Sequence, residues 1–152
     1  MYSFSSLNKL KMIYFAYFHS VINYGIIFYR NFSESNKLFF AQKKMVRTMI
    51  GSRPKISCKP PFQSLGILTI TSQYILSLMK FLLQNLEKFT FNTEVHNINT
   101  RNKLKLHKPI SNLTLYQKGV SYMSIRIFNN LNDCIERLVK NKKYFLSTLR
   151  QT

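Results

Sequence analysis

The sequence predicts an all-α fold of four or five helices in a single helical domain that spans residues 1–152. Three observations predict it. An uncharged, mostly apolar run extends from Met12 to Tyr29, later segments carry apolar residues at three- and four-residue intervals, and glycines and prolines end those segments. A chain of 152 residues is long enough for one modest core.

The run from Met12 to Tyr29 is either a buried helix or a membrane span, because its eighteen residues are at the lower length limit for crossing a bilayer. His19, Ser20 and Asn23 would form a polar stripe on one face of such a helix. These groups are costly in lipid without partners. We therefore predict a packed core helix. The alternative is a small membrane-anchored basic protein with residues 12–29 as its span.

Four later helices are predicted, over about residues 36–50, 72–89, 116–131 and 140–149, and residues 61–65 predict a single helical turn. Gly51 follows the first of these helices as a left-handed cap, and Gly66 ends the helical turn. Thr69 or Thr71 can cap the helix over residues 72–89. The apolar face predicted for the segment 36–50 consists of Leu38, Phe39, Met45, Val46, Met49 and Ile50.

Residues 90–112 separate the third and fourth long helices and are polar and basic, with Pro109 near their end. They predict a long extended basic connection. In a compact domain, a connection of this length is usually functional or disordered.

Positive charge is the outlying property of the composition, since 23 Lys and Arg stand against five acids and give a net charge of +18. Such a charge favours phosphate-bearing partners or anionic membrane surfaces. Twelve basic residues precede position 89 and eleven follow from Arg101 onward, so the charge is not confined to a tail. A high content of Lys, Asn, Ile, Phe and Tyr is also what AT-rich coding produces without selection for binding.

The candidate binding residues form two basic clusters that would contact the backbone of RNA or DNA without reading its sequence. The first cluster is Lys43, Lys44, Arg47, Arg53 and Lys55, and the second is Arg101, Lys103, Lys105 and Lys108. Because the second cluster is spaced at twos, several of its side chains would face one side of an extended segment. Tyr116, Tyr122 and Phe62 are candidates for stacking on bases, although core packing is the alternative use of each.

The sequence argues against catalysis by this chain. Asp133 is the only aspartate, and it stands three residues before Glu136, where a surface pair explains both. Two-metal phosphoryl transfer needs converging carboxylates. The three histidines and two cysteines lack ligand spacing, and no phosphate loop or nucleophile motif occurs. We therefore expect no enzyme activity, no metal, no cofactor and an intracellular location, in the nucleus or the cytoplasm.

Six short motifs occur in an order that suggests a family. They are Tyr14 with His19-Ser20-Val21 and Tyr24-Gly25; Gln42-Lys43-x-x-x-Arg47; Leu65-Gly66-Ile67-Leu68-Thr69 with Ser72-Gln73-Tyr74; Val95-His96-Asn97-x-Asn99-Thr100-Arg101; Tyr116-Gln117-Lys118-Gly119-Val120; and Phe128-Asn129-Asn130-Leu131 with Phe145. Over about residues 10–150 the chain resembles the C-terminal end of non-LTR retrotransposon reverse transcriptases of the jockey-like kind.

The resemblance implies a thumb-like helical region that follows the polymerase palm and helps to hold the RNA–DNA substrate. It also implies that the fingers and palm, with their metal-binding aspartates, are missing partners of this chain. Two positions depart from the family pattern, which often has Trp-Gly where Tyr29-Arg30 stands and a proline where Asn132 stands. The implied function is residual, sequence-independent binding of RNA or DNA. A further alternative is an inert remnant that does not fold alone.

Overall fold

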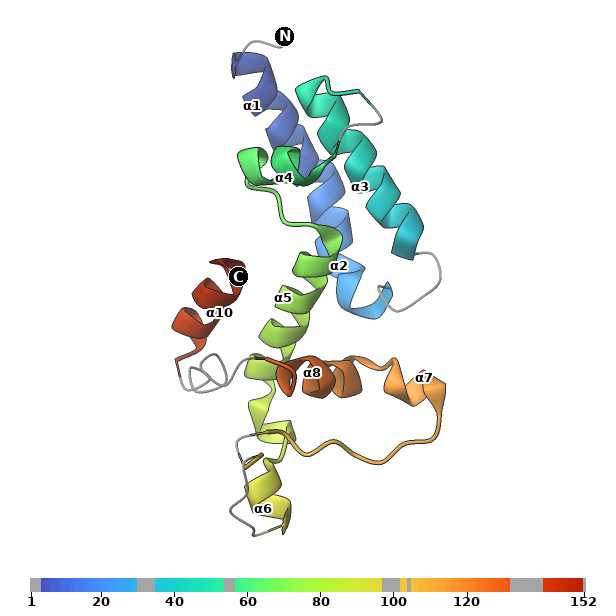
Figure 1. Cartoon of the computed structure of the whole chain (residues 1–152), viewed down its shortest axis with the longest axis vertical. Coiled ribbons are helices and arrows are strands. Elements are labelled where there is room, and N and C mark those ends of the chain that lie inside the picture. Colours follow the sequence, from blue (N-terminus) through green and yellow to red (C-terminus); the bar gives the residue numbers. More distant parts are fainter. Residues whose placement is uncertain are drawn as a thin grey trace. The chain divides into compact units, whose positions relative to one another are not determined.

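Helices dominate the part of the chain that the computed structural model describes, which is residues 4–29, 35–53, 57–96, 102–103, 105–131 and 141–151. In chain order the elements are α1 (Phe4–Ile13), η1 (Tyr14–His19), α2 (Ser20–Tyr29), α3 (Ser35–Ile50), α4 (Lys59–Leu65), α5 (Ile70–Gln84), η2 (Leu86–Lys88), α6 (Asn92–His96), α7 (Thr114–Gln117), α8 (Val120–Phe128) and α10 (Lys142–Gln151). In these ranges strand pairing is limited to an isolated bridge between Phe91 and Leu106. The prediction of an all-α fold is confirmed (Figure 1).

The structure has two centres of packing. Contacts divide the chain into two compact units, Met1–Tyr74 and Ile75–Thr152, and the boundary falls inside α5. The sequence analysis treats residues 1–152 as one helical domain, because periodicity alone does not reveal which helices share a core. Each unit is described by itself below.

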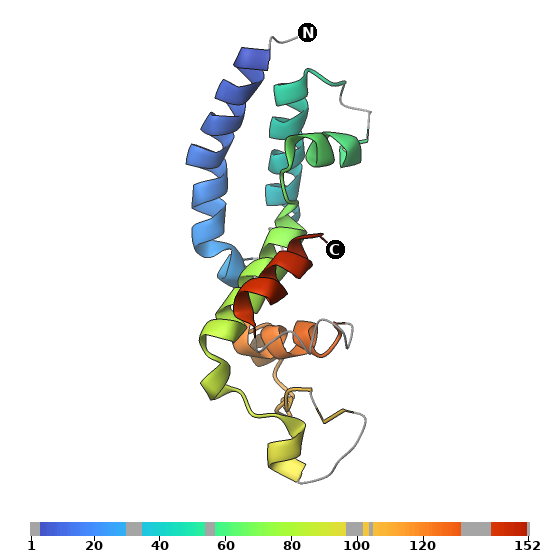
Figure 2. The ribbon, with the colours of Figure 1, turned by 90° about the vertical axis from the view of Figure 1, so that its left-hand side faces the viewer.

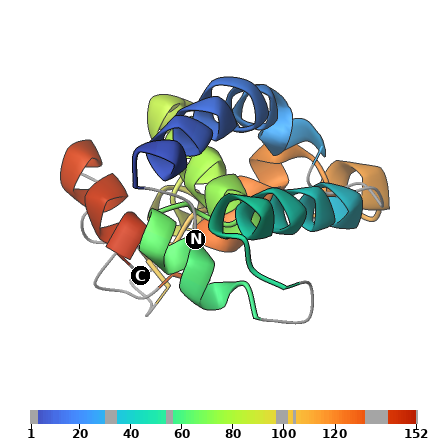
Figure 3. The same cartoon turned by 90° about the horizontal axis from the view of Figure 1, so that it is seen from above.

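The first unit is built on a helical hairpin. α1, η1 and α2 follow one another directly in sequence, and α3 returns alongside α1 in the opposite direction (Figures 1 and 2). α4 contacts α3 and lies on a different side of it from α1, as the view from above shows (Figure 3). The core of the first unit contains Tyr14, Val46, Met49, Cys58, Phe62, Leu65 and Ile67.

The first helical segment, which consists of α1, η1 and α2 (residues 4–29), buries only one of its faces. The packed helix predicted for residues 12–29 is therefore half exposed. Tyr14, Ile22 and Ile26 are buried and recur at multiples of four residues. Because an α-helix has 3.6 residues per turn, residues spaced at multiples of four move gradually around the helix and leave a single face. The wider turn of the π-helix η1, at whose end Ser20 Oγ donates to the carbonyls of Ala16 and Tyr17, offsets this drift.

The ends of the next helices lie where the sequence predicts them. α3 ends in a Schellman motif, in which Ser52 N–H donates to Arg47 O and Gly51 adopts a φ of 69°. Gly66 closes α4 with a φ of 62°. Thr69 caps the start of α5, because its Oγ1 accepts the N–H of Ser72 at 3.2 Å.

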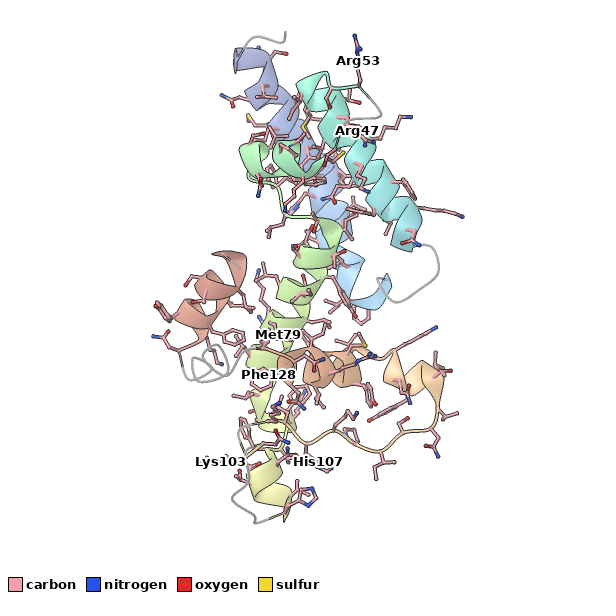
Figure 4. All side chains as sticks on the ribbon, in the orientation of Figure 1. Arg47, Arg53, Met79, Lys103, His107 and Phe128 are labelled. Atoms are coloured by element: carbon pink, nitrogen blue, oxygen red, sulfur yellow. The ribbon has the colours of Figure 1, made fainter. Side chains whose placement is uncertain are left out.

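The second unit has an apolar interior made by the remainder of α5, the segment around Leu106, α8 and α10. Its fully buried large side chains are Leu78, Met79, Leu82, Leu83, Leu106, Phe128 and Phe145. Figure 4 labels Met79 of α5 and Phe128 of α8, two of these buried side chains. Ser124 Oγ of α8 donates to Val120 O of its own helix at 2.8 Å and also lies 3.5 Å from Leu78 O, so α8 is next to α5 at this point.

The region predicted as an extended connection, residues 90–112, contains the helix α6. Glu94 explains its start, because the carboxylate accepts the backbone N–H of Phe91 at 3.0 Å. After α6, His107 N–H donates to Thr90 O at 2.8 Å, and Asn129 bonds both the N–H and the carbonyl of Leu106 at 2.9 Å. These bonds fix the returning chain against α8.

The helix predicted over residues 116–131 is interrupted. α7 ends at Gln117, and Gly119 then adopts an extended conformation with ψ of 152° before α8 begins. A Cβ atom on Gly119 would lie only 2.9 Å from the carbonyl oxygen of Tyr116. The glycine therefore permits a turn that a larger residue would obstruct.

Candidate nucleic-acid interface

The first basic cluster begins on α3, where its members differ in burial. Lys44 is exposed, while Lys43 and Arg47 are half-buried. Lys43 Nζ lies 4.1 Å from the centre of the Phe39 ring and 5.7 Å from that of Phe40. Lys43 and Arg47 are four residues apart and so share a face of α3, next to the face of Lys44.

Arg53 extends this cluster beyond the end of α3. The Schellman motif ends the helix at Ile50, and Arg53 follows two residues after Gly51 with an exposed side chain (Figure 4). Lys55, the last predicted member of the cluster, lies outside the described residues. The structure thus describes four predicted cations of the first unit on or just after one helix.

The electrostatic setting of this cluster follows from the composition of its unit. Residues 1–74 contain ten Lys and Arg and a single acid, Glu34. Glu34 lies outside the described residues, so the described part of the first unit contains no carboxylate side chain. Because this described part offers no carboxylate to neutralise the cations of α3, these cations favour contact with anionic groups of a partner.

The second basic cluster does not have the predicted extended geometry. Lys105 N–H donates to Asn102 O at 3.1 Å, so the chain turns at Asn102 and Lys103 rather than running straight. The turn follows from the bonds that hold Leu106 to Asn129 and to the chain near Phe91. Lys103 is exposed and Lys105 is half-buried, while Arg101 lies outside the described residues.

Lys108 joins an aromatic pair that the sequence analysis considers only singly. Its Nζ lies 5.9 Å from the centre of the Tyr122 ring, and the rings of Tyr116 and Tyr122 are 6.1 Å apart in an edge-to-face arrangement. Tyr116 is exposed and Tyr122 is half-buried. Phe62 is buried in the core of the first unit, which leaves the exposed Tyr116 and the half-buried Tyr122 as the candidates for stacking.

Phe40 is a candidate that the sequence analysis does not name. It stands beside Lys43 on α3, and 69% of its surface is exposed. An aromatic residue three positions before a basic one on a helix was the available signal. The apolar face that periodicity predicts for residues 36–50 does not include Phe40 either.

The polar stripe of the first helical segment has a partner within its own unit. Gln73 is buried, and its Nε2 lies 3.3 Å from Nδ1 of His19 and donates to Oδ1 of Asn23 at 3.4 Å. This contact gives His19 and Asn23 a structural role.

Residues that could support catalysis or metal binding are sparse in the described part of the chain. His96 and His107 are brought together, with ring centres 5.5 Å apart, which their sequence separation does not predict. Among the described residues no group of three or more His, Cys, Asp or Glu converges. Asp133 and Glu136 lie outside those residues.

Among the described residues, one bent pair of helices could cross a membrane by its length and composition. In the described ranges no single helix is both long and apolar enough to cross a bilayer, whereas α4 and α5 together reach that length and composition with a bend of 53° between them.

No family model, no curated protein and no solved structure matches the chain.

Proposed function

We propose that this chain is the helical, thumb-like C-terminal region of a non-LTR retrotransposon reverse transcriptase. In this proposal it is a fragment that lacks the catalytic palm, and its residual function is sequence-independent binding of RNA or DNA. The ordered motifs between Tyr14 and Phe145 support the ancestry. The proposed partners are the nucleic-acid backbone and, in the parent family, the fingers and palm.

One observation carries the binding proposal. Lys43, Lys44 and Arg47 lie on adjoining faces of one helix in a unit whose described part has no carboxylate side chain. A rigid helix holds such cations at a fixed spacing, and phosphates can replace the counterions around them. Backbone contacts of this kind position a nucleic acid without reading its bases.

Exposed aromatic rings beside lysines add a second supporting observation. Phe40 lies next to Lys43, and the exposed Tyr116 contacts the ring of Tyr122, over which Lys108 lies. Bases stack on aromatic side chains with little sequence preference, while neighbouring lysines contact the phosphates. The two clusters belong to different units, and each is proposed as a binding surface by itself.

The proposal assigns no chemistry to this chain alone. Catalysis in the parent family depends on metal-binding aspartates of the palm, and the sequence here contains a single aspartate, Asp133. We therefore expect the isolated chain to extend no primer on any template. The proposed location of the protein is the nucleus or the cytoplasm, where nucleic acids are available.

Salt-dependent binding tests the proposal. We would titrate RNA–DNA hybrids of two unrelated sequences between about 50 and 200 mM salt, a range over which phosphate contacts lose most of their affinity. Both hybrids should bind equally, and affinity should fall steeply with salt. The double variant Lys43→Glu and Lys44→Glu should bind more weakly, and its salt slope should be smaller by about two.

A matched control separates the cluster from the total charge. Lys59→Glu with Lys142→Glu makes the same change in net charge at two exposed positions outside both clusters. This control should retain most of the affinity and of the salt slope. Equal losses in both double variants would reduce the binding to a general effect of charge, and an absent or salt-independent signal would remove the proposal.

A further inference from the structure

An exposed apolar stripe runs along the first helical segment, beside the face that it buries. Its members follow one another at spacings of three and four residues, as the exposed side of a helix does. They are Ile13, Tyr17, Val21, Tyr24 and Phe28. Tyr17, Val21 and Tyr24 are 74%, 73% and 91% exposed. Large exposed apolar patches usually mark interaction sites.

The stripe borders a groove between the two arms of the hairpin. Ile13, Tyr17 and Val21 line one wall of a cavity of about 360 Å³, and Leu38 and Met45 of α3 line the other. A second cavity of about 460 Å³ shares Ile13, Tyr14 and Met45 with the first and continues toward Leu10 and Met49. The two cavities therefore form one apolar groove along α1, η1, α2 and α3, and all of its lining belongs to the first unit.

Basic side chains stand at the groove, and none of the described residues around it is acidic. Lys44 lines the second cavity and is exposed. Lys9 is exposed one helical turn before Ile13, on the same side of α1. The described part of the first unit contains no Asp or Glu. A ligand that fits this groove should combine an apolar surface with negative charge at its edges.

The shape and charge of the groove select among possible occupants. A second copy of this chain would bring the same lysines, and two chains of net charge +18 repel each other. A bilayer presents a flat surface, which cannot enter a groove between two packed helices. A single helix has the right shape, because amphipathic helices place residues spaced at i, i+3, i+4 and i+7 into such grooves.

We propose that the groove between α1–η1–α2 and α3 binds an amphipathic helix of a partner protein, with apolar residues on one face and acidic residues at the edges of that face. Tyr17, Val21 and Met45 contact its apolar face, and Lys9 and Lys44 contact its carboxylates. This interaction shares Lys44 with the first basic cluster, but its apolar contacts come from the stripe on the first helical segment, which carries no charge and is not part of that cluster.

A designed peptide tests the proposal on the full chain. The peptide has about 18 residues, or five helical turns, with Leu and one Trp on one face and Glu at the edges of that face. Because the protein contains no Trp, the fluorescence of the peptide reports binding without background. A scrambled peptide of the same composition keeps the charge and loses the apolar face. The designed peptide should bind at least about tenfold more tightly than the scrambled one.

Single substitutions locate the binding. Val21→Asp alters a side chain that is largely exposed, so the fold should persist, and the designed peptide should bind about tenfold or more weakly. Ile110→Asp makes the same chemical change at a position that is 98% exposed in the second unit, and it should leave binding unchanged. Lys44→Glu should weaken the acidic peptide but not a version in which Gln replaces Glu.

Equal affinity for the designed and scrambled peptides would overturn the proposal, because binding would then depend on charge alone. Two further measurements test the rival occupants. Co-sedimentation with vesicles of phosphatidylcholine and phosphatidylserine, abolished by Val21→Asp, would overturn it in favour of a membrane surface. Self-association in gel filtration, abolished by the same substitution, would overturn it in favour of a second copy.

Discussion

The two units of this chain differ in where they keep their polar groups. The first unit buries a hydrogen-bond network around Gln42, which is 0% exposed, and leaves an apolar stripe on its surface. The second unit buries mainly apolar side chains from α5, α8 and α10. The interior of the first unit therefore includes directional hydrogen bonds, and part of its apolar surface remains exposed to solvent.

Gln42 shows what the directional contacts do. Its Nε2 donates to Tyr14 Oη at 2.9 Å and to Leu68 O at 3.0 Å, and its Oε1 accepts the N–H of Ile70 at 3.0 Å. One side chain thus joins α3 to η1 and to the start of α5. In a buried site such bonds specify one arrangement of the helices, because each partner left unpaired is costly. Apolar contacts, as in the second unit, are less selective in direction and depend on volume.

The largest effect on stability should follow loss of volume in the second unit. Phe128→Ala removes a fully buried ring that no solvent reaches, and it should lower the free energy of unfolding by about 3–5 kcal/mol. Phe28→Ala is the matched control, because Phe28 is 60% exposed, and its effect should stay within about 0.5 kcal/mol. Denaturant titration measures both values. A small effect of Phe128→Ala would mean that the second unit lacks a tightly packed core.

A smaller effect should follow removal of the polar hub in the first unit. Gln42→Leu keeps a similar volume but leaves Tyr14 Oη, Leu68 O and the N–H of Ile70 without this partner, which should cost about 2–4 kcal/mol. Gln63→Leu on α4 is the control, since Gln63 is exposed and its substitution should be nearly neutral. If the two variants unfold at the same denaturant concentration, the network contributes nothing to stability.

Local signals allowed most helix limits to be predicted. Gly51 and Gly66 adopt the left-handed conformation that their positions after apolar periodic segments indicate. Thr69 caps α5 as its residue type predicts. Each of these features depends on neighbours within a few residues, and such neighbours can be recognised in the sequence.

Features that depend on distant partners were not predictable. Gln42 reads as a polar surface residue, because its partner Tyr14 is 28 positions away. Leu38, Met45 and Ile50 were predicted on the buried face of α3 and are exposed, since the core lies toward Gln42, Val46 and Met49. The turn at residues 102–103 likewise follows from bonds between Leu106 and Asn129, 23 positions apart.

The motif residues that carry the resemblance also have structural roles in this chain. Tyr14, Gln42 and Gln73 form the buried hydrogen bonds of the first unit, and Asn129 holds Leu106 in the second. The exposed state of Lys44, Arg53 and Lys103 was predictable from residue type. The aromatic partners of Lys43 and Lys108 were not, because they depend on rotamers and on the fold.

The smallest effect should appear as a pH dependence that belongs to the first unit alone. Burial raises the pKa of the Tyr14 hydroxyl above its ordinary value of 10.0, although the hydrogen bond from Gln42 acts in the opposite direction. The folded state therefore favours the neutral phenol. The resulting stability is fully present below pH 10.0 and is lost as the pH rises through the raised pKa of the folded protein.

Tyr14→Phe isolates this contribution, because it keeps the ring and removes the ionisable hydroxyl. At neutral pH the variant should be less stable than the parent by about 1–2 kcal/mol, since one N–H of Gln42 loses its acceptor. Above pH 10.0 the difference should shrink, because only the parent protein loses stability through Tyr14. All other tyrosines are common to both proteins and cancel. A difference in unfolding free energy that stays constant from neutral to alkaline pH would show that Tyr14 ionises alike in the folded and unfolded chain.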